Sequence, residues 1–415
     1  MAMSPNAAAL FAFLAAPGLL LAQGGVPLGP EFRVNTFTTA AQNDAAVAFD
    51  SAGNFVIAWQ GASQDGSGDG VFAQRYASGG TPLGGEFRVN TFTISGQGDP
   101  AVACDAAGNF VLVWDSYGQD GDKTGVFAQR YASTGAPLGG EFRVNTYTTS
   151  GQRFPAVVSD PLGNFVVVWD SGFYPDIFAQ RYASTGAPLG GEFRVNAYTT
   201  GAQVYPAVAS DAAGNFVVVW RSSLTPAGSH DGVFGQRYAS TGAPLGTEFQ
   251  VTSFTVYAPV HSTSVASDAT GNFVVAWDRG PQLPSDLNVF GQRYDNTGSP
   301  LGGEFRINTY TTLDQASPWI SSDLAGNFVV TWGSNGSFFG IFGQRYTSAG
   351  TPLGGEFRIN TYTAGSPNLP VVGSDPSGRF VVLWTSYGQD GSSQGVFAQR
   401  YSMIVPVELQ SFRVE

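Results

Sequence analysis

One repeated unit accounts for nearly all of the sequence beyond its first 22 residues. The strings Gly-Asn-Phe-Val or Gly-Arg-Phe-Val, followed closely by tryptophan, recur seven times, and the tryptophans from Trp59 to Trp384 are about 54 residues apart. Phe-(Ala/Gly)-Gln-Arg-Tyr also occurs seven times, and Glu-Phe-Arg-(Val/Ile)-Asn occurs six times with one variant at Glu248. A repeat of this length indicates an array of similar supersecondary units, which constrains the fold more than any single residue does.

Each unit contains four short apolar runs bounded by Gly, Pro, Asn and Asp, a pattern typical of four β-strands. The composition agrees, because the chain has 55 glycines, a single lysine and only 12% charged residues, and is therefore poor in strong helix formers. A linear solenoid would need distinct capping repeats, which are not visible. We therefore predict an all-β fold, a seven-bladed β-propeller with four antiparallel strands per blade.

The order of the strands within a blade also follows from their residues. The small-residue run at 206–211 suits a crowded innermost strand, and Phe-Val-Val-Val-Trp, Gln-Arg-Tyr and Glu-Phe-Arg follow outward. We expect the glutamates and arginines of the two outer strands to pair across their hairpin. The first outer-strand copy, Glu31–Asn35, precedes any inner strand, so it is expected to complete blade seven. Ser411–Glu415 resembles a degraded further copy that competes for this place or adds to another subunit.

The two ends of the chain are expected to lie outside the propeller. Residues 1–22 contain an apolar run that is too short to span a bilayer, and they are interpreted as a signal peptide cleaved after Ala22. This predicts a secreted or periplasmic protein with a propeller at 23–403 and a tail at 404–415. The net charge of −12 argues against nucleic acid and anionic membranes as partners, and the single cysteine excludes an internal disulfide.

The blade pattern Pro-x-(Val/Ala)-Ala-x-Asp-x-x-Gly-Asn resembles NHL-type propeller repeats. The strings Glu-Phe-x-Val-Asn, Gly-Gln-Asp-Gly-Ser-Gly and Gln-Arg-Tyr are similar to repeats of large secreted bacterial calcium-binding and adhesin-like proteins, over residues 25–401. The resemblance implies propeller blades and an extracellular setting. It does not carry a calcium role with it, because the tandem glycine-aspartate nonapeptides of those proteins are missing here.

The loops between the second and third strands, and those between consecutive blades, differ from copy to copy, whereas the other two connections barely change. These variable loops share one face of the disc, so we expect ligand binding there. Exposed aromatic rings suit sugars or a protein partner, although the rings could instead pack between neighbouring loops. The candidate ligand-binding residues are Tyr117, Phe173, Tyr174, Tyr257, Trp319, Phe338, Tyr387, His230 and His261, with Tyr205 beside them; solvated loop histidines are the alternative for His230 and His261.

Two of these loops have oxygen-bearing side chains at alternate positions before a glycine, as calcium-binding loops do. The candidate metal ligands are Asp65, Ser67 and Asp69 in one loop, and Asp120, Asp122 and Thr124 in the other. Ca²⁺ is the cofactor that these residues would imply. Ordinary polar turns are the alternative, because no bidentate acid follows at a suitable distance.

For function, the sequence favours a secreted, non-enzymatic binding or adhesion module that is monomeric and contacts a glycan or an extracellular protein. An enzyme needs a converging set of acids and bases, and the loops offer only scattered aspartates and two histidines. The alternatives are an extracellular polysaccharide-cleaving hydrolase or lyase, and a structural subunit that assembles through its C-terminal strand.

Overall fold

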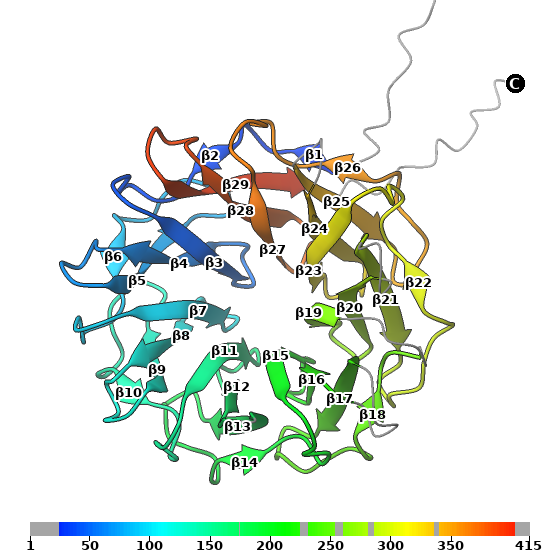
Figure 1. The fold of residues 1–415 in the computed structure, drawn as a ribbon, viewed down its shortest axis with the longest axis horizontal. Coiled ribbons are helices and arrows are strands. Elements are labelled where there is room, and N and C mark those ends of the chain that lie inside the picture. The colour runs from blue at the N-terminus through cyan, green and yellow to red at the C-terminus, as the bar shows by residue number, and fades with distance from the viewer. Residues whose placement is uncertain are drawn as a thin grey trace, which may run out of the picture.

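The computed structural model is a ring of seven antiparallel sheets (Figure 1), which confirms the predicted all-β seven-bladed propeller. It describes residues 25–173, 175–224, 231–253, 260–280, 286–335 and 340–402. The proposed signal peptide and C-terminal tail lie outside these residues. Within the described ranges, no helix is long and apolar enough to cross a membrane.

Each blade runs from an inner strand beside the channel to a two-residue outer strand at the rim. Blade one contains β3 (Gln42–Phe49), β4 (Phe55–Ala62), β5 (Asp69–Tyr76) and β6 (Phe87–Arg88). Blade two contains β7 (Gln97–Cys104), β8 (Phe110–Tyr117), β9 (Thr124–Tyr131) and β10 (Phe142–Arg143). Blade three contains β11 (Gln152–Ser159), β12 (Phe165–Ser171), β13 (Asp176–Tyr182) and β14 (Phe193–Arg194). Blade four contains β15 (Gln203–Ser210), β16 (Phe216–Ser222), β17 (Gly232–Tyr238) and β18 (Phe249–Gln250).

The remaining blades follow the same plan, with one change at the ends of the chain. Blade five contains β19 (Val260–Ser267), β20 (Phe273–Arg279), β21 (Asn288–Tyr294) and β22 (Phe305–Arg306). Blade six contains β23 (Asp314–Ser322), β24 (Phe328–Asn335), β25 (Gly340–Tyr346) and β26 (Phe357–Arg358). Blade seven contains β27 (Asn368–Ser374), β28 (Phe380–Tyr387) and β29 (Gln394–Ser402), joined by β1 (Val26–Pro27) and β2 (Phe32–Arg33) from the start of the chain.

A repeated aspartate fixes the turn between the first two strands of each blade. In blade four, Asp211 Oδ1 accepts hydrogen bonds from the backbone of Ala213 and Asn215, each at 2.9 Å. Gly214 between them has a φ of +79°, a conformation that glycine adopts without strain. This turn holds the inner strand and its neighbour in register, and the register in turn places the tryptophan of the second strand.

The core lies between blades rather than within them. All seven blade tryptophans are fully buried, and Trp114 of blade two packs in one cluster with Val56 and Ala58 of blade one. Trp59 of blade one packs in the same way with Leu383 of blade seven. Each sheet therefore buries apolar area only against its neighbours, so the stability of a blade depends on a closed ring.

The inner strands are irregular at one end. In blade two, the pairing of β7 with β8 shifts between Gly98 and Ala101, which is a β-bulge. The residue in the bulge has a positive φ, +48° at Asp99 and +54° at Tyr205. Asp44, Phe154, Ser317 and Leu369 have the same conformation at the equivalent position. This bulge turns the chain at the end of each strand that faces the variable loops.

The repeated outer-strand glutamates bond to the neighbouring blade and not to the arginines of their hairpin as expected, although Arg194 pairs across its hairpin with Asp176 at 3.7 Å. Glu86 of blade one accepts hydrogen bonds from Thr36 N at 2.7 Å and Thr36 Oγ1 at 2.9 Å, which follow the outer strand of blade seven. Arg237 of blade four donates to the backbone oxygen of Asn296 in blade five at 2.6 Å. These side chains link neighbouring blades, because in a propeller the next blade is closer to them than their own hairpin partner.

The first strands of the chain complete blade seven, as expected for Glu31–Asn35. In β2, Phe32 pairs with Ala398 and Arg33 with Phe397 of β29. The bridge from Pro27 to Tyr401 occupies the place of the Tyr-Pro bridges in the other blades. The competing segment Ser411–Glu415 lies outside the described residues.

Ring closure can be tested at Val34, which is buried among Phe55 and Tyr76 of blade one and Val396 of blade seven. Val34→Ala should lower the free energy of unfolding by about 2 kcal/mol, because it removes two methyl groups from a packed core. The neighbouring exposed Arg33 provides the control, and Arg33→Ala should change stability by less than about 0.5 kcal/mol. Urea unfolding of both variants measures this. Equal stability of the two variants would contradict the assignment of residues 31–35 to blade seven.

Candidate functional site

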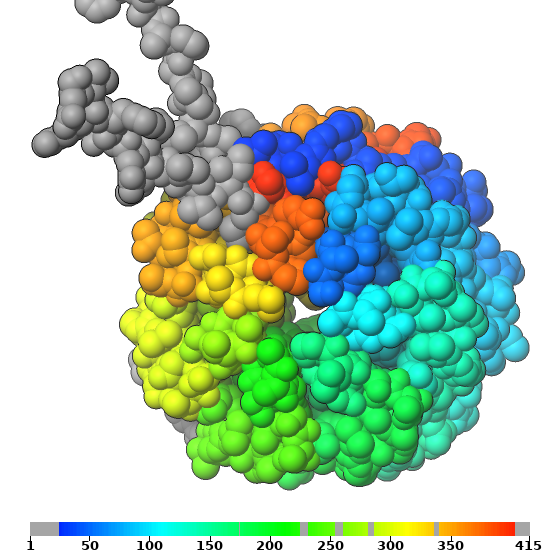
Figure 2. Space-filling model, turned by 180° about the vertical axis from the view of Figure 1, so that it is seen from behind, coloured from blue at the N-terminus to red at the C-terminus, as the bar shows by residue number. Residues whose placement is uncertain are grey.

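The seven inner strands surround a central cavity of about 590 Å³, and the ring is open at its centre (Figure 2). Small residues line most of the wall, but Phe154, Tyr205, His261 and Trp319 also line it. Phe154 and Tyr205 occupy the bulge positions of blades three and four, next to the variable loops. The mouth of the channel on that face therefore has aromatic side chains from blades three to six.

Phe154 and Tyr205 form a pair of rings at this mouth. Their centroids are 4.7 Å apart with an interplanar angle of 55°, and the Arg153 guanidinium lies 5.4 Å from the Phe154 centroid. Tyr205 is exposed and Phe154 is half-buried. The pair offers an apolar surface on which a flat ligand can rest.

Four aspartates from blades one to three form a second group of side chains near the bulges. Asp44 and Asp99 occupy the bulge position of blades one and two, while Asp115 and Asp170 directly follow the tryptophans of blades two and three. Gly98 stands opposite Asp115 in the strand register, and Arg153 stands opposite Asp170. We call Asp44, Asp99, Asp115 and Asp170 the acid cluster.

Within the acid cluster, the strand register sets Gly98, the residue before Asp99, opposite Asp115. Burial raises the pKa of both carboxyl groups, and repulsion from Asp99 adds to the effect on Asp115, while Arg153 opposes it. Because two carboxylates that repel one another cannot both be ionised at low cost, the pair retains a proton above the usual range of an aspartate. Such a pair can donate a proton near neutral pH.

Asp170 follows Trp169 on β12 of blade three and is 0% exposed. Neither of its carboxylate oxygens accepts a hydrogen bond of normal geometry from the described residues, and the Arg153 Nε is 3.8 Å away. Burial raises the pKa of Asp170 to about 7, although Arg153 and the backbone N–H of Tyr205 lower it in part. The charge of an ionised Asp170 is therefore poorly compensated.

Asp278 occupies the same position in blade five, but its carboxylate has hydrogen-bond donors that Asp170 lacks. It is also fully buried, but it accepts hydrogen bonds from His261 N at 2.9 Å, Ser262 N at 3.0 Å, Ser262 Oγ at 2.9 Å and Ser317 N at 2.9 Å. These donors satisfy its charge. Blade three provides no such set of donors to Asp170.

Asp44 extends the acid cluster into blade one. Burial raises its pKa to about 6, and Asp99 and Asp69 add repulsion. Asp69 itself accepts a hydrogen bond from Gln60 Nε2 at 2.9 Å. Acids from adjacent blades thus act on one another across the blade boundary.

The predicted ligand-binding residues are only partly brought together. Trp319, which is 43% exposed, and His261 both line the channel. Tyr117 and Tyr387 are the last residues of the second strands β8 and β28, and Phe173, which is 82% exposed, lies in the loop after β12. Tyr174, Tyr257, Phe338 and His230 lie outside the described residues.

The predicted metal ligands make hydrogen bonds within their own loops and to adjoining segments. Asp65 accepts from Ser67 N at 3.1 Å and Asn90 Nδ2 at 3.3 Å, and Asp120 accepts from Asp122 N at 3.4 Å and Asn145 Nδ2 at 3.2 Å. In the described part of the chain, no group of three or more His, Cys, Asp or Glu side chains is arranged to hold a metal ion. These bonds favour the polar-turn alternative, and calcium binding by these loops stays a prediction.

Sequence reasoning did not select the acid cluster or Arg153. A signal exists for Asp44 and Asp99, which stand where other blades have Phe154, Tyr205 or Ser317. Comparison of the copies at inner-strand positions, rather than in the loops, would have found the departure.

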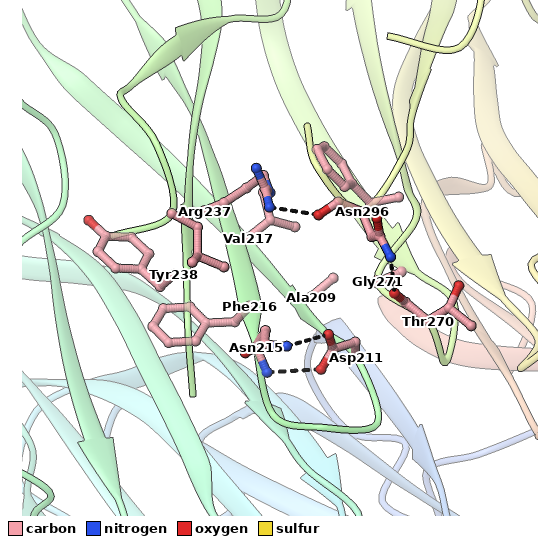
Figure 3. Close-up of a pocket in the computed structure, with 13 residues that line it drawn as sticks. Ala209, Asp211, Asn215, Phe216, Val217, Arg237, Tyr238, Thr270, Gly271 and Asn296 are labelled. Carbon is pink, nitrogen blue, oxygen red and sulfur yellow. Dashed lines mark hydrogen bonds between the residues drawn. The ribbon is translucent and has the colours of Figure 1, made fainter. Parts of the chain in front are cut away.

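A second type of pocket, between blades four and five, belongs to the repeated scaffold (Figure 3). It has a volume of about 250 Å³ and lies at the turns on the opposite face of the disc. Its polar groups are occupied, since Asn215 Nδ2 donates to Asp211 at 2.7 Å and Asn296 Nδ2 donates to Thr270 O at 3.1 Å. A matching pocket of about 240 Å³ lies between blades two and three, as expected for a structural feature of the repeat.

Comparison with solved structures supports the fold. An ulvan lyase of polysaccharide lyase family PL25, bound to a GlcA–Rha3S chain, matches with a TM-score of 0.59 and 11% identity over 88% of this chain and 95% of its own. The GH93 α-L-arabinofuranosidase of Fusarium graminearum with arabinobiose matches with a TM-score of 0.52 and 12% identity over 90% and 98%. A protein of unknown function from Dyadobacter fermentans matches with a TM-score of 0.54 and 11% identity over 91% and 98%. No family model and no curated protein sequence matches the chain.

The prediction of a non-enzymatic binding or adhesion module is wrong in the light of these comparisons. The propellers of known activity that this chain resembles are a glycoside hydrolase and a polysaccharide lyase. The physical reason given for excluding an enzyme also fails, because the structure brings acids from three blades together. Those acids are dispersed in the sequence and lie on the inner and second strands, not in the variable loops.

The poorly compensated charge of Asp170 predicts a specific pH dependence of stability. Its pKa is about 7 in the folded chain against an ordinary value of 3.8, so between these pH values the folded state binds the additional proton and stability falls as pH rises. Asp170→Asn removes this loss, and relative to the unsubstituted chain it should gain up to about 4 kcal/mol at about pH 8. At about pH 5 the gain should be less than half as large, about 1.5 kcal/mol, because the pH is only slightly more than one unit above the ordinary pKa.

Urea unfolding at both pH values measures the effect. Asp278→Asn is the matched control, because it removes a buried carboxylate with four donors and should destabilise the chain at both pH values. A difference between Asp170→Asn and the parent chain that is the same at both pH values would contradict the shifted pKa.

Proposed function

We propose that this chain is a carbohydrate-active enzyme that hydrolyses glycosidic bonds of a polysaccharide at the mouth of its channel. The observation that carries the proposal is the pairing of Asp115 with Gly98, next to Asp99, which gives two half-buried acids whose carboxyl groups repel one another, together with the Phe154–Tyr205 ring pair in the wall of the central channel. Solved propellers of similar fold that cleave glycans support it by analogy.

Glycoside hydrolysis requires one carboxyl group that protonates the leaving oxygen and a second that acts as base or nucleophile. The two groups must stand roughly 5 to 10 Å apart to leave room for the sugar. Asp99 and Asp115 act on each other's protonation, so we assign the pair as a single proton donor. Burial and mutual repulsion keep its pKa raised, which suits a general acid.

The second carboxyl group is assigned to Asp44. Asp170 is fully buried and has no exposed surface with which to reach a sugar, whereas Asp44 is half-buried. Asp44 occupies on blade one the position that Asp99 occupies on blade two, so the two flank the same blade boundary. The rings of Phe154 and Tyr205 would support the sugar on the adjacent wall.

An extracellular location belongs to the same proposal. It rests on the apolar segment within residues 1–22 and on the resemblance of the repeats to those of secreted bacterial proteins. A polysaccharide substrate is consistent with it, since such polymers are met outside the cell.

The proposal is tested with a panel of polysaccharides and a reducing-end assay. Asp115→Asn and Asp99→Asn should each lower kcat by about a hundredfold or more on any substrate that is cleaved, because the proton donor is lost. Asp295→Asn is the control, since this exposed acid lies in a turn on the opposite face and should leave kcat unchanged.

Two results would reject the proposal. Full activity of Asp115→Asn would remove the assigned donor, and the absence of cleavage across neutral, acidic and amino polysaccharides would remove the hydrolase function itself. Products with an unsaturated end would indicate elimination instead of hydrolysis.

A further inference from the structure

The wall of the central channel is free of carboxylate, ammonium and guanidinium groups. Blades one to four contribute mainly alanine, valine and proline with Phe154 and Tyr205, while blades five to seven add several serines, His261 and Trp319. None of the described residues that line the cavity is Asp, Glu, Lys or Arg. The Nδ1 of His261 lies 3.8 Å from Oδ1 of the buried Asp278, so a charge on this imidazole is balanced there. The wall therefore has no group to compensate the charge of an ionic ligand.

The inner strands provide hydrogen-bonding groups in place of charges. Each inner strand pairs with one neighbour in its sheet, so its other edge faces the channel (Figure 1). Alternate N–H and C=O groups along such an edge have no partner in the sheet. Ser262, Ser264 and Ser321 add hydroxyl groups to the same wall. A neutral ligand rich in hydroxyls can bond to these groups, whereas a charged ligand would lose its hydration without compensation.

Trp319 introduces a large ring where the other blades have small side chains. In the strand register it stands opposite Thr331, and the equivalent residues of blades one to four are alanines: Ala46, Ala101, Ala156 and Ala207. Trp319 is 43% exposed and lines the cavity. It lies two residues beyond the bulge residue Ser317, and therefore deeper in the channel than the bulge residues Phe154 and Tyr205.

Aromatic rings thus reach a ligand in the channel from two sides. Figure 1 places β11 and β15, which carry Phe154 and Tyr205, across the channel from β23, which carries Trp319. Aromatic faces pack against the apolar faces of sugar rings, while hydroxyls at the edge of the sugar can reach the polar groups of the wall. The cavity volume of about 590 Å³ lies within the range of about 300–1,000 Å³ that is usual for small-molecule sites.

We infer that the channel holds the terminal sugar of a neutral polysaccharide, which is cleaved from its end. Inner strands of all seven blades enclose the cavity (Figure 2), so a polymer enters it end first. Asp99 directly precedes the lining residue Pro100. Asp44 likewise precedes the lining residue Ala45. The assigned acids therefore flank the mouth, where the bond behind the terminal sugar would lie. The inference rests on the proposed function and specifies its substrate class and mode of cleavage.

Cleavage at the mouth consumes one water molecule. The leaving oxygen takes the proton of the Asp99–Asp115 pair, and the oxygen of water joins the anomeric carbon. The proton that the water loses replaces the one given to the leaving oxygen, so the carboxyl groups end in their initial state. A neutral sugar in the channel leaves the proton of the pair in place until this step.

Trp319 provides a reporter for the test, because the other seven of the chain's eight tryptophans are 0% exposed. The experiment is acrylamide quenching of tryptophan fluorescence in the full chain. Cellotriose, xylotriose and arabinotriose are the neutral probes, and trigalacturonate and a deacetylated glucosamine trimer are the charged ones. We expect at least one neutral probe to lower the quenching constant by about half, and the charged probes to leave it unchanged. This comparison needs no variant, so it does not depend on the folding of a mutant.

Variants then locate the effect. Trp319→Phe keeps an aromatic ring but removes the accessible fluorophore, so quenching should fall to the level of the buried tryptophans with or without a probe. Trp319→Ala should weaken binding of the protecting probe by about tenfold in isothermal titration calorimetry. Tyr147→Ala is the control, since this ring is 55% exposed but is not among the residues that line the channel, and binding should not change.

Cleavage from the end is measured separately by viscosity. With a neutral polysaccharide that is cleaved, one short product should accumulate while the viscosity of the polymer stays nearly constant. A rapid fall in viscosity would show cleavage within the chain and overturn the inference.

Equal protection by charged and neutral probes, or protection by none of them, would also overturn it. The proposed hydrolysis is judged independently. Protection by a neutral probe without cleavage of any polysaccharide supports the neutral sugar site and rejects the hydrolase. Cleavage confined to charged chains, without protection by a neutral probe, does the reverse.

Discussion

Packing between neighbouring blades is the interaction on which the rest of this structure depends. A four-stranded sheet has two faces to cover, and here each face is covered by the next sheet: Trp59 packs against Leu383 of the preceding blade, and Trp114 packs against Val56. A blade without neighbours would expose both faces to water, so the ring must close. The chain closes it with its own first strands, and Glu31 accepts a hydrogen bond from Thr361 N at 2.8 Å across the junction.

Because packing between blades holds each sheet in place, the inner strands can keep costly local conformations that an isolated sheet would lose. The bulge at their ends places Asp44, Asp99 and Phe154 at positive φ, and such conformations carry a cost. A further cost comes from Asp170, which is buried without adequate donors. The packing of the seven buried tryptophans between blades stabilises the fold by more than these local conformations cost. Asp44, Asp99 and Phe154, which have these strained conformations, are residues to which we assign chemistry. This agrees with the observation that proteins retain local strain where it serves a functional site.

The contrast between Asp170 and Asp278 explains why position in the repeat does not fix a residue's role. Both follow a buried tryptophan and both are fully buried. Asp278 is surrounded by donors from Ser262 and from Ser317 of the next blade, whereas Asp170 meets a distant guanidinium. The prediction of a non-enzymatic module overlooked this, because it sought function where the loops vary. Asp44 and Asp99 lie instead on inner strands, and Asp115 and Asp170 lie on second strands, outside the variable loops.

The sequence alone determined the number of blades and the order of strands within them, because these follow from a local pattern that repeats. For the closing strand of blade seven it left Glu31–Asn35 and Ser411–Glu415 in competition, and the structure pairs Phe32 and Arg33 with β29. Only the tertiary structure decided which charges meet. Glu86 and Arg237 contact adjacent blades and not their hairpin partners, and Arg153 of blade three acts on the charges of Asp99 and Asp115 in blade two. The physical reason is that a propeller sets side by side inner strands that are about 55 residues apart in sequence, and no local pattern records the contacts between them.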